Sequence, residues 1–588
     1  MKSYNTTFVR FIGHADSSIN ELPACLEYII YDKDSNKLNE FRKSVNNDKK
    51  FKFFHLDVIN ENQRFLQLLD GLSMLRKKTC QYVNIDFDTL DTDAINNILH
   101  NLWLKNIKLY PSVVKIKNDE DYAGKLYTKL NPSFCILPWM HIQYKPSGQP
   151  KLCCRYDISL EANEAVKNPD SDDLLLKLSP AKDNITVKES SMEQSFFGDY
   201  WSASRQYTQN QTPLIGCHKC YKEEQGTQGE VQNSMRLGSS ILYNQGYLHK
   251  QPEYEKPRLE FLEVGFGNYC NLACLSCNSS LSTSWYQDEL ELNKVVNNNV
   301  KRMVFPKLDN LKFAPDAETL KTLRVIKFTG GEPMINPEFT KFIELICEQG
   351  RPEQISLEIY TNCSYVPSPK LLENLTRFEA IQMNLSVDAY GTVNDYVRYG
   401  SHWLGNTKQT VSNAIDFWLT VGKEHENISV IMSTTLSALN VLEIPKLMSW
   451  WMDKYKASGN KIVIRRELLL ATEYDGFFKL QPAHDPSYIN LNILPKESYK
   501  DVLDWIESYK ENFTSTYPDL QGIPECIGAS LLKLEQLINK ATGNADNGRD
   551  LLHYLDSMDK IRKNNAEQAI PAIVQRVKEY LLTQDKLQ

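Results

Sequence analysis

The sequence lacks any long apolar run. No stretch approaches 18 uninterrupted apolar residues, and the first residues, MKSYNTTFVRFIGHADSS, contain no apolar core of a signal peptide. A membrane-spanning helix needs about 20 mostly apolar residues, so the sequence predicts none. We therefore expect a cytoplasmic protein that is not held in a membrane.

Long runs of one charge are also missing. The net charge is −7, from 67 Lys and Arg residues and 74 Asp and Glu residues. This balance gives no electrostatic argument for binding nucleic acid or an anionic membrane. The 588 residues are too many for one core, so about two to four domains are expected.

Cysteine, by contrast, is plentiful. Eight of the 13 cysteines lie between residues 135 and 277, and the other five are scattered along the chain. In a reducing compartment, clustered cysteines indicate metal binding or catalysis rather than disulfides. The scattered ones are interpreted as small buried apolar residues, which is how free cysteines usually behave.

Strand-like and helix-like patterns divide the chain into four expected parts. The first alternates strands and helices and predicts a small parallel α/β domain, and the second is irregular and carries five cysteines. The third holds six βα units, from the strand-like RLEFLEVGF to KIVIRREL at 461–468, and predicts an open, partial (β/α)6 barrel of the TIM type. The fourth is a mainly helical extension. The four parts are expected at 1–117, 118–250, 251–475 and 476–588.

Three cysteines, Cys270, Cys274 and Cys277, follow the first strand of the expected barrel. The active site of such a barrel lies at the carboxyl ends of its strands. A closed iron–sulfur or zinc site uses four protein ligands. Three thiolates can instead hold three irons of a 4Fe–4S cluster and leave the fourth iron open to a chelating ligand.

The spacing C-x3-C-x2-C resembles that of the radical S-adenosylmethionine (radical SAM) superfamily. The segment FTGGEP after the second strand looks like the GGE motif of that family, and LSVDAYGTVNDYVRYGS follows the fourth strand. By resemblance, the backbone at Gly330, Gly331 and Glu332 would hold the methionine amino group. Ser386 and Asp388 would bind the ribose, and Arg398 would bind the methionine carboxylate. The resemblance covers roughly residues 130 to 475 and implies a SAM-binding 4Fe–4S cluster.

A second cysteine group precedes the expected barrel. Cys135, Gly148 and Cys153 have the form C-x12-G-x4-C, which is similar to the start of the twitch and SPASM auxiliary-cluster modules. With Cys217 and Cys220, these cysteines would close a second iron–sulfur cluster, and Cys154 is the spare or substitute ligand. A structural zinc site, with His141 and His218 as possible ligands, is the alternative. In better-known members of the family the auxiliary module follows the core.

The resemblance implies an enzyme that reductively cleaves S-adenosylmethionine and abstracts a hydrogen atom from its substrate. We expect a peptide or an amino-acid-like metabolite as substrate and a reductant such as flavodoxin or ferredoxin as partner. A sugar or nucleoside-type substrate stays open, as does an iron–sulfur or zinc scaffold without radical turnover. Cys363, in YTNCS after the third strand, is a candidate hydrogen donor, although a small loop-filling residue is the simpler interpretation.

Overall fold

A computed structural model describes most of the chain from residue 135 onward. The described residues are 53–58, 80–85, 135–168, 172–180, 185–210, 212–225, 234–236, 239, 257–308, 310–405, 410–460, 478–483, 486–516 and 523–586. Among them, no helix is long and apolar enough to cross a membrane.

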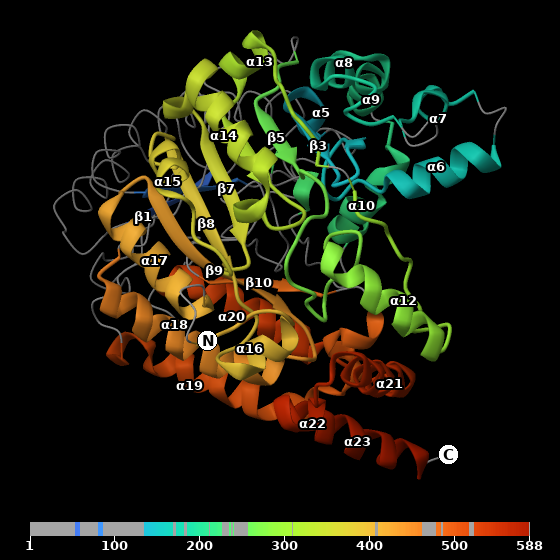
Figure 1. Cartoon of the computed structure of the whole chain (residues 1–588), viewed down its shortest axis with the longest axis vertical. Helices are drawn as coiled ribbons and strands as arrows, with labels where there is room; N and C mark the ends of the chain where they lie inside the picture. The colour runs from blue at the N-terminus through green and yellow to red at the C-terminus, as the bar shows by residue number, and fades with distance from the viewer. Residues whose placement is uncertain are drawn as a thin grey trace.

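The fold is organised around one eight-stranded sheet with the strand order β10-β9-β8-β7-β6-β5-β3-β4 (Figure 1). Every neighbouring pair is parallel except the β3–β4 hairpin. Six strands therefore lie in chain order, as expected for βα units with right-handed crossovers. This mostly parallel α/β sheet is confirmed, and it is consistent with the partial barrel. The strands are β3 (His141–Tyr144), β4 (Pro150–Lys151), β5 (Phe261–Val264), β6 (Val325–Phe328), β7 (Ser356–Thr361), β8 (Ala380–Ser386), β9 (Ile428–Leu436) and β10 (Phe478–Pro482).

The two faces of the sheet differ in polarity. In β8, Ile381, Met383 and Leu385 belong to the apolar core, while Gln382 and Asn384 point to the other face because strand side chains alternate. The same polar face carries a row of side chains in register across four strands, formed by Glu263, Lys327, Glu358 and Gln382. The interior of an ordinary (β/α) barrel is filled mainly by bulky aliphatic residues. This sheet instead places charged and amide groups there.

Helices follow the strands and pack on the apolar face. Helix α14 begins where the Asn336 side chain accepts a bond from the Glu338 N–H and Pro337 occupies the first turn. It buries Phe339 and Phe342 at helical spacing against the strands. These helices lie together along one side of the sheet in Figure 1. They are α14 (Pro337–Gln349), α15 (Pro369–Leu375), α17 (Val411–Glu424) and α18 (Ile444–Ser458).

The cysteine-rich segment shares the sheet with the barrel strands. Its strand β3 pairs in parallel with β5, so the predicted boundary near residue 250 is crossed by sheet hydrogen bonds. Short helices surround this edge and bury Trp201 and Phe196 in the common core. The irregular segment is therefore an extension of the barrel sheet. Its helices are α5 (Leu137–Met140), α6 (Ile158–Lys167), α7 (Leu174–Leu178), α8 (Met192–Phe197), α9 (Asp199–Gln209) and α10 (His218–Gln225).

The last part of the chain begins with a strand. β10 pairs with β9, and it lies beyond the predicted end of the barrel at residue 475. The predicted strand at 461–468 lies outside the described residues. The helices that follow are α19 (Lys500–Thr516), α20 (Ile523–Asn539), α21 (Ala545–Arg562), α22 (Ala566–Ala569) and α23 (Pro571–Asp585), as Figure 1 shows.

The expected N-terminal domain is described only at two strands, β1 (Phe53–Val58) and β2 (Cys80–Ile85). They pair in parallel, and each overlaps a predicted strand, in the segments KFKFFHLDV and YVNIDFD. The other predicted strands of this domain lie outside the described residues.

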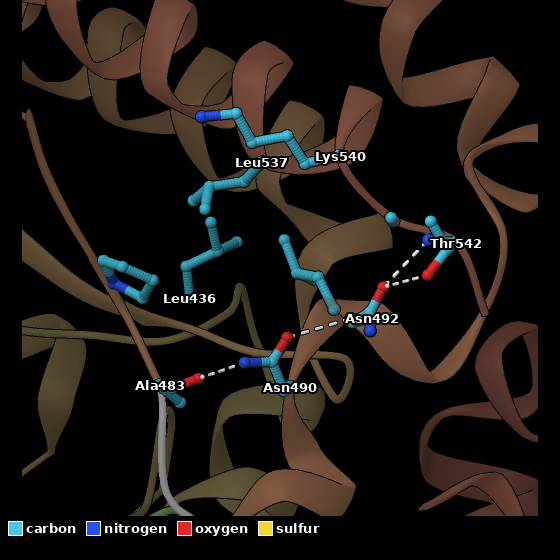
Figure 2. A pocket seen from close by; sticks show the side chains of 10 residues that line it. Leu436, Ala483, Asn490, Asn492, Leu537, Lys540 and Thr542 are labelled. Carbon is cyan, nitrogen blue, oxygen red and sulfur yellow. Dashed lines mark hydrogen bonds between the residues drawn. The ribbon is translucent and has the colours of Figure 1, made fainter. Parts of the chain in front are cut away.

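A small cavity lies at the carboxyl ends of β9 and β10 (Figure 2). Leu436 and Ala483 border it on the sheet side, and Leu537 and Lys540 border it on the side of α20. Its volume is about 210 Å³. Because pockets for small molecules usually measure about 300–1,000 Å³, this one is too small for a peptide.

Candidate functional site

The three-cysteine loop follows β5, with Cys274 buried and Cys270 and Cys277 half-buried. Burial raises the pKa of Cys270 to about 11. The pKa of Cys277 is raised by burial first and then by the neighbouring thiols of Cys274 and Cys270. The three sulfur atoms therefore lie within electrostatic reach of one another. Free thiols in such a place stay protonated at neutral pH and lose their protons when they bind metal.

Side chains from other segments donate hydrogen bonds to the backbone carbonyls of the three cysteines. The Trp285 indole donates to the Cys274 carbonyl over 2.9 Å, and Arg302 donates to the Cys277 carbonyl over 2.7 Å. Ser284 donates to the Cys270 carbonyl over 2.9 Å. These bonds fix the backbone of all three cysteines. The loop thus presents three sulfur atoms from a fixed frame.

The donor set of this loop suits a cluster. Three thiolates can each bind a different iron of a 4Fe–4S cluster, which leaves its fourth iron open. Cys274 is buried, and Cys270 and Cys277 are half-buried. Among the residues that the structure describes, no group of three His, Cys, Asp or Glu side chains is placed to hold a single metal ion.

The predicted glycine motif packs against this loop. Gly330 and Gly331 have φ values of +73° and +48°, a region that favours glycine. A Cβ atom at Gly331 would lie 2.4 Å from the carbonyl oxygen of Tyr269, the residue before Cys270. The N–H of Glu332 donates to that same carbonyl over 2.9 Å. The glycines thus let the two loops touch through their backbones.

The side chain of Glu332 is used inside the protein. Its carboxylate is 2% exposed and accepts bonds from the Thr361 hydroxyl over 2.9 Å and from the N–H of Asn362 over 2.6 Å. The N–H of Met334 is a third donor, at 3.0 Å. Burial raises the pKa of Glu332 to about 7, although these hydrogen bonds oppose the rise. This carboxylate ties the glycine loop to the end of β7.

This raised pKa predicts a pH dependence of stability. Because the folded chain binds the Glu332 proton more tightly than the unfolded chain, the stability from this group is full below about pH 4.5 and is lost as the pH rises through 7. The free energy of unfolding of the wild type, relative to Glu332→Gln, should therefore fall by about 3 kcal/mol between pH 4.5 and 7.5. Urea denaturation of unreconstituted protein at several pH values measures it. The control variant Glu318→Gln changes an exposed residue, so its free energy of unfolding should depend on pH as that of the wild type does. If the pH dependence of Glu332→Gln were also the same as that of the wild type, the raised pKa of Glu332 would be contradicted.

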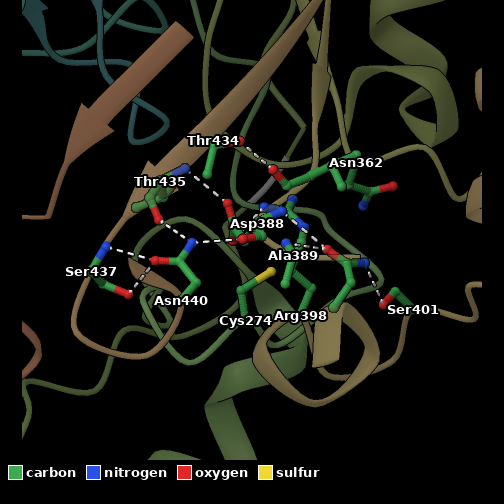
Figure 3. A network of polar contacts seen from close by, with 12 residues as sticks. Cys274, Asn362, Asp388, Ala389, Arg398, Ser401, Thr434, Thr435, Ser437 and Asn440 are labelled. Carbon is green, nitrogen blue, oxygen red and sulfur yellow. Dashed lines mark hydrogen bonds and ion pairs between the residues drawn. The ribbon is translucent and has the colours of Figure 1, made fainter. Parts of the chain in front are cut away.

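The loop after β8 brings two of the predicted site residues together. Asp388 is fully buried and accepts a bond from Arg398 over 3.0 Å, while its other oxygen accepts the N–H of Thr435 over 2.8 Å. Figure 3 shows this pair with the Cys274 side chain pointing toward it. The Nε atom of Arg398 is buried without a hydrogen-bond partner. The predicted ribose ligand and the predicted carboxylate ligand are thus an ion pair beside the cysteine loop. Ser386, the last residue of β8, is partly exposed.

The loop after β7 directs Asn362 toward the cysteines. The Asn362 amide donates to the Cys270 sulfur over 3.7 Å and to Asn271 over 3.0 Å. Sequence reasoning singled out its neighbour Cys363 and missed Asn362, although both lie in the same strand-end segment. Cys363 is fully buried with φ +61°, and its thiol contacts the Thr361 carbonyl at 3.8 Å. A role for Cys363 as a hydrogen donor stays a prediction.

Residues 264–433 match the family model described as Radical SAM superfamily. The chain carries a radical SAM domain. Such a domain implies an enzyme. The matched segment starts at the end of β5 and runs into β9, so it holds the three-cysteine loop, the glycine motif and the Asp388–Arg398 pair. A search of curated proteins finds no match.

Solved structures with some likeness to this chain include two with a peptide bound. One is native anSMEcpe with bound AdoMet and Cp18Cys peptide, with 16% identity, coverage of 44% of this chain and 62% of that chain, and a TM-score of 0.28. Another is Streptococcus suis SuiB, with 11% identity, coverage of 55% and 60%, and a TM-score of 0.26. SuiB bound to the precursor peptide SuiA gives 13% identity, coverage of 53% and 60%, and a TM-score of 0.24. The chain thus spans about three fifths of the length of these structures.

Next to the radical SAM domain, the second cysteine group also gathers in space. Burial raises the pKa of Cys153 well above its usual value, and nearby thiols raise it further. Those thiols are Cys154, Cys220, Cys217 and Cys135. Three of the four are the other members of the predicted ligand set.

Cys154 has different surroundings from Cys153. Burial raises the pKa of Cys154 to about 11, and the largest charged influence is Glu263 on β5, followed by Lys327 on β6. Its thiol thus lies toward the polar face of the sheet. This difference favours Cys153 as the ligand.

The two histidines of the zinc alternative lie near the second cysteine group along the chain. His141 is buried in β3, where its Nδ1 atom lies 2.8 Å from the Leu152 carbonyl. Burial lowers the pKa of His141 to about 3. His218 directly follows Cys217 and lies near the surface, 3.9 Å from Asp157. A zinc site in this group stays a prediction.

Proposed function

We propose that the radical SAM domain reductively cleaves S-adenosylmethionine and abstracts a hydrogen atom from a substrate. The single observation that carries this proposal is the convergence of the three-cysteine loop, a glycine loop in backbone contact with it and the Asp388–Arg398 pair. When bound, a reduced 4Fe–4S cluster supplies the electron that splits the sulfonium into methionine and a 5′-deoxyadenosyl radical. The electron would come from a reductant such as flavodoxin or ferredoxin.

The residues around the three-cysteine loop divide the binding tasks. Cys270, Cys274 and Cys277 would hold the cluster. The backbone at Gly330 and Gly331 would bind the methionine amino group, because the glycines let this backbone lie directly against the cysteine loop. The role of Glu332 in this proposal is to fix that backbone through Thr361 and Asn362.

The residues after β8 would bind the rest of the cofactor. Ser386 and Asp388 would bind the ribose hydroxyls. A carboxylate has about four lone-pair positions, so Asp388 can accept further bonds while it holds Arg398. The unpartnered Nε of Arg398 is available for the methionine carboxylate.

The substrate would lie against the polar face of the sheet. There the ammonium groups of Lys327 and Lys479 lie 3.6 and 3.7 Å from the Glu358 carboxylate, and both lie over the ring of Tyr360. Lys327 is also in register with Glu263, so this face carries cations and anions side by side. Such a face suits the ammonium and carboxylate groups of an amino acid or peptide. A peptide or amino-acid-like metabolite is therefore the proposed substrate class.

The proposal is tested on anaerobically purified, reconstituted protein. After reduction with dithionite and addition of S-adenosylmethionine, 5′-deoxyadenosine should accumulate and be detected by chromatography. With an auxiliary cluster, roughly eight irons per chain are expected. A cluster-replete protein that forms no 5′-deoxyadenosine with or without candidate peptides would contradict radical turnover and favour the scaffold alternative.

The iron count also tests the auxiliary cluster, which we propose is bound by Cys135, Cys153, Cys217 and Cys220. Replacing Cys153 with Ala should lower the iron content from roughly eight to roughly four per chain, because one cluster loses a ligand. The matched Cys154→Ala variant should keep all its iron, since its thiol lies toward Glu263 and Lys327. About four irons together with zinc in the wild type would instead assign this group to zinc.

A further inference from the structure

Helix α21, in the C-terminal extension, packs against the three-cysteine loop and helix α12 (Tyr286–Val295). The hydroxyl of Tyr554 donates to the carbonyl of Leu275, which lies between Cys274 and Cys277, over 2.9 Å. Arg302, which donates to the carbonyl of Cys277, places its guanidinium 4.8 Å from the ring centre of Tyr554 and 4.8 Å from that of Trp285. A segment outside the matched family region therefore forms the back wall of the cysteine loop.

Arg562, the last residue of α21, is buried in this wall. Its side chain is 3% exposed, and its guanidinium lies 4.4 Å from the ring centres of both Trp285 and Tyr399. Its Nε atom donates to Asp288 over 2.8 Å. Both terminal nitrogens are buried and have no hydrogen-bond partner among the residues that the structure describes. Leaving buried donors unpaired costs stability, so packing alone gives no reason for an arginine here.

The two residues whose rings enclose Arg562 are hydrogen-bonded to the cysteine loop. The Trp285 indole donates to the carbonyl of Cys274 over 2.9 Å, and the backbone carbonyl of Tyr399 accepts the N–H of Ala273 over 2.8 Å. A single residue, Trp285, therefore contacts both the Arg562 guanidinium and the middle cysteine of the loop.

We propose that Arg562 is a positioning residue that holds a buried positive charge against the three-cysteine loop and thereby raises the reduction potential of the cluster bound there. This inference rests on the proposed function, since it requires the cluster. Uptake of one electron from a flavodoxin- or ferredoxin-type donor adds a negative charge, and a nearby cation in a poorly screened place stabilises that reduced state. Asp288 partly offsets the cation.

If the Arg562 charge favours the reduced cluster, replacing Arg562 and replacing its ion-pair partner Asp288 should have opposite effects. In Arg562→Gln, the ratio of reduced to oxidised cluster at a fixed potential should fall roughly tenfold, because one buried charge is lost. In Asp288→Asn, where Arg562 keeps its place between the rings, the same ratio should rise. Arg549→Gln removes an exposed arginine of the same helix, paired with Asp546 and Asp585, and should leave the ratio unchanged.

The measurement is a redox titration of reconstituted holoprotein followed by electron paramagnetic resonance. The signal of this cluster is the one whose shape changes on addition of S-adenosylmethionine, because only its open iron can bind a ligand.

Shifts of the midpoint potential with opposite sign in Arg562→Gln and Asp288→Asn support the inference. If Arg562→Gln does not fold, the upward shift in Asp288→Asn decides alone. Unchanged midpoints, or shifts of the same sign in both variants, overturn the inference while the proposed function stands. A wild type without this cluster would overturn both, and the iron count identifies that case.

Discussion

Replacing Cys274 with Ala should abolish formation of 5′-deoxyadenosine. Cys274 is the middle ligand of the three, its carbonyl is fixed by Trp285, and its side chain points toward the Asp388–Arg398 pair. With two thiolates left, the cluster loses one of its three anchors to the chain. The iron content should fall by about four per chain while the auxiliary cluster is kept. Chromatography of the reaction mixture and an iron assay measure both effects.

Cys347 provides the matched control for this substitution. It is also buried, but it lies in α14, where its thiol contacts the Asn374 carbonyl at 3.6 Å. Cys347→Ala should lower the free energy of unfolding by about 1 kcal/mol and leave cleavage and iron content as in the wild type. Cleavage by an iron-depleted Cys274→Ala protein would show that the reaction does not depend on this loop.

The strands of the barrel could be predicted from the sequence because their signals are local. Alternating or continuous apolar residues, bounded by turn residues, mark a strand whatever lies elsewhere in the chain. The predicted strand segments that hold β5, β6, β7, β8 and β9 are all strands of the one sheet. Gly330 and Gly331 were likewise predicted from their own motif, and their positive φ values agree with a close backbone approach.

Contacts between distant segments could not be predicted in this way. The pairing of β3 with β5 joins residues about 120 positions apart, and nothing in the short segment HIQY marks a parallel partner. Arg562 stands 288 positions after Cys274, in a helix that carries no family motif. The ion pair between Asp388 and Arg398 was not predicted either. The motif assigned a cofactor group to each of the two residues and gave no sign that they contact each other. Such partners are fixed by tertiary packing, which a single sequence does not display.

The choice between Cys153 and Cys154 shows the same limit at short range. The two residues are adjacent, and either thiol satisfies the spacing of a ligand pair. Their electrostatic surroundings differ, since the pKa of Cys153 is raised by the neighbouring thiols and that of Cys154 by Glu263, in both cases after burial. Side-chain direction depends on the backbone path, so the sequence left both open.

Gly331→Ala should both destabilise the fold and reduce cleavage roughly a hundredfold. The new Cβ atom would lie 2.4 Å from the carbonyl oxygen of Tyr269 and 3.1 Å from its carbonyl carbon. The carbonyl group of Tyr269 belongs to the backbone and cannot rotate away as the end of a flexible side chain can. The segment that leads into Cys270 must therefore move. A displacement of this loop shifts the thiols relative to the binding residues for S-adenosylmethionine. Urea denaturation and the rate of 5′-deoxyadenosine formation measure the two effects.

Gly391→Ala separates this clash from simple backbone strain. Gly391 also has a positive φ, +69°, but a Cβ atom there would meet no atom of the described residues within 4 Å. Both substitutions place alanine at a positive φ, a strained backbone conformation that costs about 1–3 kcal/mol. Any loss in Gly331→Ala beyond that of Gly391→Ala therefore measures the contact between the glycine loop and the cysteine loop. Equal losses in stability and cleavage would mean that the two loops can separate without harm, and that the glycine motif acts through its conformation alone.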